Sequence, residues 1–424
     1  MEKRIYPRTN EIAYWDKLPN GLTVAVIPRQ GFSRKMAYFV TGAGALHRCF
    51  TADGVPYTAP MGVAHYLEHK LFDMPGRDVS AEFAALGASV NAFTSYDMTA
   101  YYFTCTESFE ACLRLLLEFV STPYFTEESV EKEQGIIGQE IDMNLDAPES
   151  RIFELLMEAM YEKHPVREPI LGTREFIGEI TPQVLYDCHR ACYCPENMIL
   201  CVVGDVEPEA VSQIALEMTA SMAHPSVQLQ NQWQEPKRCC KQKAGFSMEV
   251  ARPMFQLGFK CDPLGTGETG IYREFVGDLA AEVLFGESSE LYLRLYESGL
   301  IDPSFGGGLD TVPGMAILTA TGDSDDPEGV RDAILEQGRR IAREGIPEED
   351  FLRIKRSTLG GRIRSLDSFD SVCFRICAYY FSGFDYFRFP EIYESVKAED
   401  VQEFIRQVVT EDRCSLAVIE PKEE

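Results

Sequence analysis

The sequence is poor in several features that would point to common classes of protein. Its 424 residues include only six histidines and two tryptophans, and 40 basic residues stand against 67 acidic ones. The resulting net charge of −27 argues against nucleic acid and anionic membrane surfaces as partners. No apolar run is long enough to span a bilayer, and residues 1–7 do not resemble an apolar signal region.

The cysteines also lack a recognisable pattern. There are 13 of them, and no two form a CxxC pair. Cys188, Cys192 and Cys194 are close together, but their spacing is poor for metal ligands, so we interpret them as free thiols. An odd number of scattered thiols is typical of a reducing compartment, and we therefore expect a cytoplasmic protein.

One short segment carries most of the chemistry. Residues 62–72 are typical of an amphipathic helix, in which His65 and His69 project from the same face, one turn apart. Two neutral imidazoles at this spacing can hold one Zn²⁺, which in a catalytic site needs a third protein ligand and a water. Glu68, at the edge of that face, could take the proton of this water. The H-x-x-E-H order is the signature of the inverted zincins, and the alternative is a pair of ordinary core or solvated histidines.

A second segment, residues 126–145, could supply the missing ligand. We predict a helix there, because it opens with a capping threonine and acidic residues. Glu133 and Glu140 are two turns apart and share a face beside the apolar Ile136 and Ile137. One carboxylate could bind a metal while the other accepts a hydrogen bond from a ligand histidine. Two exposed glutamates on an acidic helix are the alternative, which the H-x-x-E-H motif disfavours.

The remaining pattern of the first half indicates strands and helices in alternation. A hairpin at residues 88–103 could be an ordinary one on the core, or its first strand could receive an extended peptide at a sheet edge. His47 stands in a glycine-rich loop without a carboxylate partner, so we expect it at the surface. We also expect strands at 22–27, 36–41 and 198–203, and helices at 79–86, 108–120, 149–162 and 207–222.

The second half repeats this outline. Residues 346–351 echo residues 125–130 at an offset of 221, at which Glu133 and Glu140 correspond to Ile354 and Gly361. Because no histidine occurs after His224, we predict a copy of the first domain without metal ligands. Its elements are a strand at 254–259, helices at 272–284, 289–296 and 326–344, and a strand pair between 304 and 322. The polar stretch 224–243 is interpreted as a linker between a zinc-binding domain, 1–223, and its homologue, 244–424.

Taken in order, these motifs resemble the pitrilysin/insulinase family of zinc peptidases. The resemblance runs through residues 65–69, 86–95, 133–140, 172–173, 193–197 and 203–205, and the details at 68–70, 130–133 and 299–302 are most similar to its bacterial YmfH-like branch. It implies an α+β fold of two homologous domains, each a mostly antiparallel sheet with helices packed on it, facing each other across a chamber.

The resemblance also implies roles for individual residues. It makes His65, His69 and Glu140 the ligands of one Zn²⁺ per chain. It makes Glu68 the general base and Glu133 a residue that supports the site. By the same implication, Asn91, Ala92 and Phe93 form the edge that holds the backbone of a peptide substrate.

The sequence departs from the family at one place. Members usually carry an arginine and a tyrosine in the second domain that bind substrate near the scissile bond, but here Tyr296 and Asp302 stand at those positions and Arg294 lies two residues away. We therefore expect a zinc endopeptidase for short or unfolded peptides that acts as a homodimer, or as a heterodimer with a related subunit carrying the Arg/Tyr pair. The alternatives are a non-catalytic scaffold or assembly subunit, and a metal-dependent peptide-binding chaperone with negligible turnover.

Overall fold

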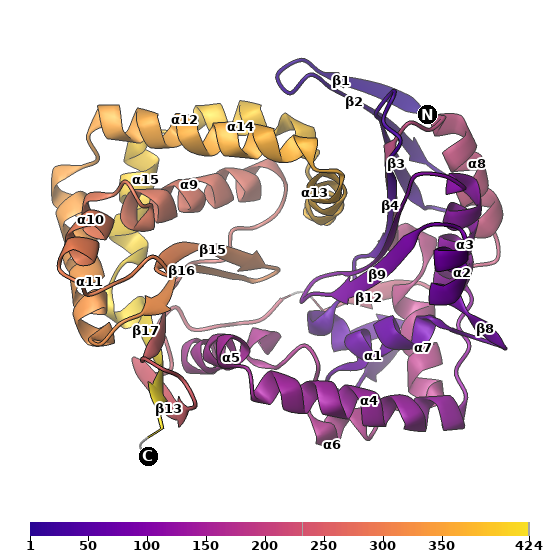
Figure 1. The fold of residues 1–424 in the computed structure, drawn as a ribbon, viewed down its shortest axis with the longest axis horizontal. Coiled ribbons are helices and arrows are strands. Elements are labelled where there is room, and N and C mark those ends of the chain that lie inside the picture. Colours follow the sequence, from indigo (N-terminus) through magenta and orange to yellow (C-terminus); the bar gives the residue numbers. More distant parts are fainter. Residues whose placement is uncertain (231, 423–424) are drawn as a thin grey trace. The chain divides into compact units, whose positions relative to one another are not determined.

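A computed structural model describes residues 1–230 and 232–422 of the chain. The chain separates into two compact units, which are described individually (Figure 1). Each unit combines a mostly antiparallel sheet with helices, which confirms the predicted α+β class. The chamber between domains stays a prediction. Unit 1 comprises Met1–Ile141, Pro169–Asn231 and Ile363–Arg388, and unit 2 comprises Asp142–Glu168, Gln232–Arg362 and Phe389–Glu424.

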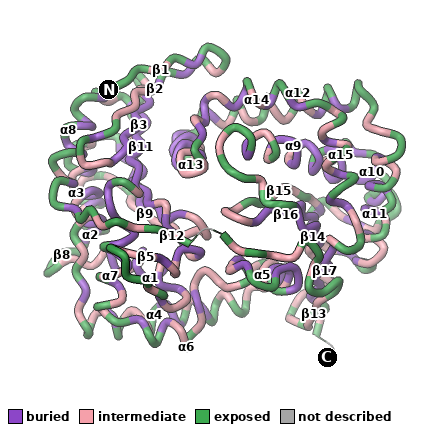
Figure 2. Tube along the Cα trace, turned by 180° about the vertical axis from the view of Figure 1, so that it is seen from behind, coloured by how far each residue is buried: buried purple, intermediate pink, exposed green. Residues whose placement is uncertain are grey.

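Unit 1 is built on a seven-stranded sheet with the order β1-β2-β3-β11-β4-β10-β9. All neighbours are antiparallel except β3 and β11, which are parallel. Every residue of β11 is buried, as its apolar sequence predicts, and the strand is purple in Figure 2. The strands are β1 (Glu2–Tyr6), β2 (Glu11–Lys17), β3 (Thr23–Pro28), β4 (Lys35–Thr41), β9 (Ser89–Thr94), β10 (Thr99–Cys105) and β11 (Met198–Gly204).

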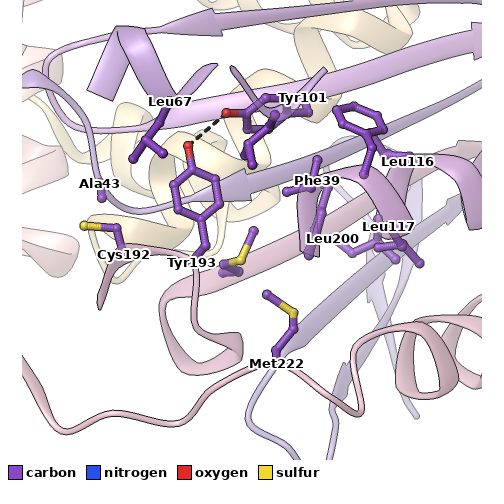
Figure 3. Packing of buried hydrophobic residues seen from close by; sticks show 14 of the residues in the cluster. Phe39, Ala43, Leu67, Tyr101, Leu116, Leu117, Cys192, Tyr193, Leu200 and Met222 are labelled. Carbon is purple, nitrogen blue, oxygen red and sulfur yellow. Dashed lines mark hydrogen bonds between the residues drawn. The ribbon is translucent and has the colours of Figure 1, made fainter. Parts of the chain in front are cut away.

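Helices of the first half pack beside this sheet and complete a large apolar core. Leu116 and Leu117 of α3 lie beside Phe39 and Leu200 of the sheet (Figure 3). In the same core the hydroxyl groups of Tyr101 and Tyr193 bond to each other at 2.9 Å, which satisfies two polar atoms that would otherwise be costly to bury. The helices are α1 (Val63–Leu71), α2 (Val79–Ala85), α3 (Phe109–Ser121), α4 (Glu127–Leu145), α6 (Arg174–Ile177), α7 (Pro182–Cys192) and α8 (Pro208–Met218).

Unit 2 repeats the central part of this topology. Its sheet has the order β13-β17-β14-β16-β15, with β13 and β17 parallel and the other pairs antiparallel. The order β17-β14-β16-β15 therefore matches β11-β4-β10-β9 of unit 1, which supports the predicted internal repeat. The strands are β13 (Lys243–Met248), β14 (Met254–Lys260), β15 (Gly306–Val312), β16 (Met315–Asp323) and β17 (Cys414–Pro421).

One interior strand of unit 2, β17, has no counterpart among the sequence expectations, which assign no element after residue 351. β17 lies between β13 and β14 and is nearly all buried. The elements predicted for this half are confirmed, although their ends differ by up to five residues: the strand at 254–259, the helices at 272–284, 289–296 and 326–344, and the strand pair between 304 and 322. The helices of this unit are α9 (Gly267–Phe285), α10 (Glu290–Glu297), α11 (Pro327–Glu344), α12 (Glu348–Arg364), α14 (Phe389–Ser395) and α15 (Ala398–Val408).

Each unit also contains one helix from the other half of the sequence. α5 (Pro148–Met160) packs on β13, β14 and β17 of unit 2, whereas α13 (Phe369–Phe381) packs on β4 and β11 of unit 1. The two helices start and end 221 residues apart, which is the offset found in the sequence. The contact units differ from the contiguous domains 1–223 and 244–424 by these segments, and the domain boundaries stay a prediction.

The stretch predicted as a linker, 224–243, makes specific contacts at both ends. β12 (Val227–Leu229) pairs with β5 (Cys49–Ala52) in unit 1, and Glu235 forms an ion pair of 2.8 Å with the buried Lys260 in unit 2. Asn231 lies outside the described residues, as do residues 423 and 424 of the predicted second domain. Within the described part of the chain, none of the helices combines the length and the hydropathy needed to cross a membrane.

Candidate metal centre

The helix predicted to carry the metal ligands is α1, and its entry requires a glycine. Gly62 has φ +87°, and a Cβ atom at this position would lie 2.5 Å from the carbonyl oxygen of Leu171. Behind the ligand face, Tyr66, Leu67 and Leu71 of α1 are buried in the core of unit 1. The helix is therefore held firmly while one face stays available for chemistry.

The structure brings His65, His69 and Glu140 together. Their three ligand atoms all lie within 4.8 Å of one another, and no other group of His, Cys, Asp or Glu meets this criterion among the described residues. The Nε2 atoms of His65 and His69 each lie 3.5 Å from a different oxygen of Glu140. Ligands about 2.0–2.1 Å from a tetrahedral Zn²⁺ are separated by roughly 3.3 Å, so these residues fit the ion.

Glu133 lies on the other side of His69. Its Oε1 atom is 3.0 Å from Nδ1 of His69, while Nε2 of the same ring faces Glu140. An acceptor at Nδ1 favours the tautomer whose Nε2 can bind a metal. His65 has no such support, because its buried Nδ1 atom has no hydrogen-bond partner in the described structure.

The carboxylates set the charge of this centre. Burial by itself would lower the pKa of His69, but the hydrogen bond to Glu133 and the charges of Glu140, Glu133 and Glu68 raise it overall. The hydrogen bond with His65 lowers the pKa of Glu140, so this carboxylate is ionised at neutral pH. A metal ion held here would therefore have an anionic ligand in Glu140 and would compete with a proton for His69.

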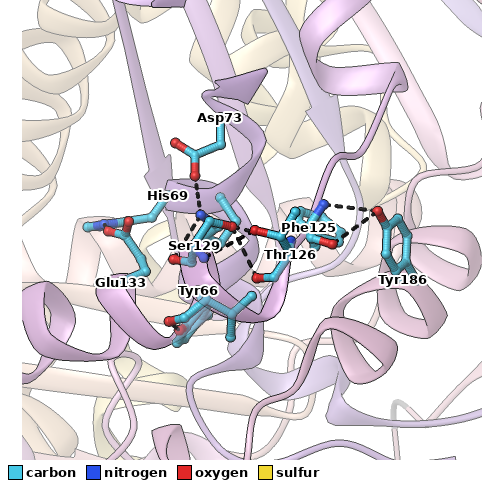
Figure 4. A network of polar contacts seen from close by, with 10 residues as sticks. Tyr66, His69, Asp73, Phe125, Thr126, Ser129, Glu133 and Tyr186 are labelled. Carbon is cyan, nitrogen blue, oxygen red and sulfur yellow. Dashed lines mark hydrogen bonds and ion pairs between the residues drawn. The ribbon is translucent and has the colours of Figure 1, made fainter. Parts of the chain in front are cut away.

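Two side chains of α1 fix the position of α4, the helix that carries both glutamates. The hydroxyl of Tyr66 donates to the carbonyl of Val130 at 2.5 Å, and Nζ of Lys70 donates to the carbonyl of Ser129 at 3.2 Å. The Lys70 ammonium is fully buried and also pairs with Asp73. Figure 4 shows these contacts beside His69 and Glu133. They lie about one helical turn before Glu133 and so set where α4 places its carboxylates.

Glu68 is not part of the group of His65, His69 and Glu140, and its expected role as general base stays a prediction. Its side chain is 9% exposed, and its Oε2 atom accepts a hydrogen bond of 2.6 Å from the hydroxyl of Thr94. Thr94 is the last residue of β9, and no motif in the sequence marks it as a contact of Glu68. The alternation of side chains along a strand could have indicated this contact, because it puts Thr94 on the same face as Ala92.

The strand expected to receive substrate, β9, lies at the edge of the seven-stranded sheet. Asn91, Ala92 and Phe93 pair with β10, and no described strand pairs with the opposite edge of β9. The backbone N–H of Ala92 donates to Oδ1 of Asn91 at 2.8 Å. A peptide that used this donor would have to displace the Asn91 side chain.

Three further residues that the sequence suggested as candidates do not belong to this group. His47 is only 6% exposed, and its Nδ1 accepts a hydrogen bond from the N–H of Gly44, so the expectation of a surface position was wrong. The reason is a short 3₁₀ turn at Ala45–Arg48, which rotates the ring inward. In unit 2, Tyr296 is 49% exposed on α10, and Asp302 forms an ion pair with Arg252.

Comparisons with known proteins find relatives that match nearly the whole chain. A family described as Insulinase (Peptidase family M16) matches residues 58–174, and one described as Peptidase M16 inactive domain matches residues 179–358. The uncharacterized zinc protease YmfH of Bacillus subtilis is 35% identical, over 98% of this chain and 98% of its own length. The match to the inactive domain covers the second half of the chain, whereas the candidate metal-binding group of the described residues lies in the first half.

The fold of this chain is also similar to those of solved structures. The crystal structure of an M16-like peptidase from Alicyclobacillus acidocaldarius has a TM-score of 0.92 at 30% identity, covering 97% of this chain and 99% of that one. A protease from Helicobacter pylori has a TM-score of 0.84 at 18% identity, covering 96% and 99% of the two chains, and therefore shares the fold.

Proposed function

This chain belongs to the insulinase family of peptidases, M16, and on that premise we propose that it is a zinc-dependent endopeptidase for short or unfolded peptides. The observation that carries the proposal is the convergence of His65, His69 and Glu140, with the carboxylate of Glu68 beside them and outside the ligand set. Zinc held by these three residues would polarise the scissile carbonyl and acidify a water molecule.

In this proposal each protein group has a separate task. Glu68 accepts a proton from the attacking water and later returns it to the amine that leaves, because its carboxylate is close to the ligands but does not belong to them. Glu133 orients the ring of His69 through Nδ1, where their atoms are 3.0 Å apart. Tyr66 and Lys70 hold α1 and α4 together, so that the two histidines and Glu140 stay in reach of one ion.

We assign substrate binding to the free edge of β9. An extended peptide would add to Asn91, Ala92 and Phe93 as a further strand, with its backbone bonded to theirs. The position of Glu68 next to Thr94, at the end of the same strand, supports this assignment, because it brings the base close to the docked backbone. Extended backbone is available in unfolded or short peptides, which is the reason for proposing that substrate class.

A partner subunit belongs to the same proposal. Tyr296 and Asp302 stand where relatives usually have an arginine and a tyrosine, and neither a phenol nor a carboxylate stabilises a developing oxyanion as an arginine does. We propose a homodimer or a heterodimer with a related chain that supplies this pair. All thirteen cysteines are free, which supports a reducing, cytoplasmic location.

The decisive experiment compares Glu68→Gln with His65→Ala. We expect Glu68→Gln to keep its zinc and lose hydrolysis by about 10²–10⁴-fold, because a positioned acid–base group typically contributes that factor. His65→Ala should lose both zinc and activity. Glu131→Gln, on the exposed side of α4, is the matched control and should change neither.

The readouts are zinc content by mass spectrometry and cleavage of an unstructured peptide library, with and without chelator. The wild-type chain is assayed alone and with candidate partner subunits. Full activity of Glu68→Gln would exclude Glu68 as the base. If the wild-type chain, alone or with any partner, binds peptide in a chelator-sensitive way but does not cleave it, the result would favour a peptide-binding protein. If the chain assembles with a partner but binds no peptide, the result would favour a scaffold subunit.

A further inference from the structure

A single hydroxyl group joins the proposed base to the proposed docking strand. Oγ1 of Thr94 lies 2.6 Å from Oε2 of Glu68, a separation typical of a hydroxyl donating to a carboxylate. No other described side chain forms a hydrogen bond with Glu68. The two residues come from different elements, β9 and α1, so this bond also joins an edge strand to the ligand-bearing helix.

We propose that Thr94 is a positioning residue that holds the Glu68 carboxylate in the orientation needed for catalysis. Through Thr94, this orientation depends on how well ordered the backbone of β9 is. This inference rests on the proposed function, because it assigns no new reaction to the site. Thr94 does not contact the reacting atoms in this arrangement. It acts through Glu68, by occupying one carboxylate oxygen and leaving Oε1 as the free acceptor.

A glutamate side chain is flexible unless a neighbour holds it. It has three rotatable bonds, and Glu68, next to the ligand face, has no ion pair with a described basic residue to fix its rotamer. A charge-assisted hydrogen bond from a rigid neighbour removes that freedom. Thr94 is such a neighbour, because threonine is stiff about χ1 and its backbone pairs with Thr99 of β10.

The location of Thr94 gives the bond a second consequence. β9 is an edge strand, and only one of its sides is paired in the described structure. An extended peptide bound along the other side would reduce the fluctuations of the strand up to its last residue, and hence those of the Thr94 hydroxyl. A peptide that pairs with β9 therefore also fixes the orientation of the Glu68 carboxylate as it binds. A peptide that pairs poorly leaves this carboxylate mobile.

The test uses two variants of Thr94 and one control. Thr94→Val keeps the shape of the side chain but removes the donor, whereas Thr94→Ser keeps the donor. Thr104→Val is the matched control, because Thr104 lies at the other end of the same hairpin and its hydroxyl donates to the backbone of Lys35. Urea unfolding and zinc content verify that each variant is folded and loaded.

We expect Thr94→Val to lower kcat by roughly 10- to 100-fold, the usual value of one hydrogen bond to a charged group, with KM unchanged within about twofold. Thr94→Ser should recover most of kcat, and Thr104→Val should behave as wild type. An unchanged kcat in Thr94→Val, or a loss that serine does not restore, would overturn the inference.

Crystal structures of both Thr94 variants separate this inference from the proposed function. The Glu68 carboxylate should leave its position in Thr94→Val and keep it in Thr94→Ser. If wild-type protein shows no hydrolysis, the proposed function fails, but the carboxylate position still decides whether Thr94 orients Glu68. A Glu68 side chain that stays in place in Thr94→Val would show that Thr94 does not position it.

Discussion

Removing Asp73 should destabilise unit 1 more than removing the lysine it pairs with. Lys70 is 0% exposed, and its ammonium donates to Asp73 and to the carbonyl of Ser129. Asp73→Asn would leave this ammonium buried with no opposite charge. Breaking a buried ion pair in this way costs about 3–5 kcal/mol, but the Asp73 side chain is 47% exposed and water screens the pair. We therefore expect a loss of about 2–3 kcal/mol in the free energy of unfolding.

Lys70→Met should have a smaller effect, although it deletes the buried member of the pair. Methionine fills a similar volume and carries no charge that needs compensation, so replacing the ammonium by it is often neutral or stabilising. The carbonyl of Ser129 lies in α4, where a backbone N–H of the next turn can still bond to it. We expect a change within about 1 kcal/mol. The double variant should resemble Lys70→Met rather than the sum of both single changes.

The assay is urea unfolding followed by the fluorescence of one tryptophan. The chain has two, Trp15 in unit 1 and Trp233 in unit 2, so a Trp233→Phe background reports unit 1 by itself. The protein is kept free of metal, because an ion bound only to the native state would add its own stabilisation. Asp187→Asn, at a carboxylate whose partner is the neutral Gln183, serves as the control.

Asp73→Asn should therefore be less stable than Lys70→Met, and the opposite order of stability would refute this prediction. If Asp73→Asn costs less than Lys70→Met, the buried charge of Lys70 is not what Asp73 compensates. If the effects of the two variants simply add, the two side chains stabilise the unit independently and do not act as a pair.

Three further predictions follow from other parts of the molecule. Glu133→Gln should weaken zinc binding about 10- to 100-fold in a chelator competition, because the ring of His69 loses its carboxylate acceptor. Burial lowers the pKa of His189 from 6.5 to about 4. Between these two pH values the unfolded chain therefore binds a proton at His189 that the folded chain does not. The free energy of unfolding should fall by up to ~3 kcal/mol between pH 6.5 and 4, and His189→Gln should lose this part of the pH dependence in urea titrations. In unit 2, Glu235→Gln should destabilise by about 3–5 kcal/mol and by more than Lys260→Met, since both partners are buried here, as read from Trp233 in a Trp15→Phe background.

Local patterns in the sequence account for much of the fold and for the candidate metal ligands. The spacing of His65 and His69, and of Glu133 and Glu140, follows from the helical period alone, and both pairs share a face in the structure. Asp78, which precedes the helix predicted at 79–86, caps α2 by accepting from the N–H of Ala81. The 221-residue offset likewise survives in α5 and α13. In each case the signal lies within one element or repeats along the chain.

The spacing of residues along the chain is enough to predict which side chains share a helix face, where helices begin, and that the chain repeats. Which of these faces meet depends on the tertiary structure. It buried His47 by turning a short loop inward, placed β17 between β13 and β14, and brought Thr94 to Glu68 across 26 residues. The physical reason is that helical period and capping act between neighbours along the chain, whereas strand order and burial depend on partners that the spacing of residues does not name.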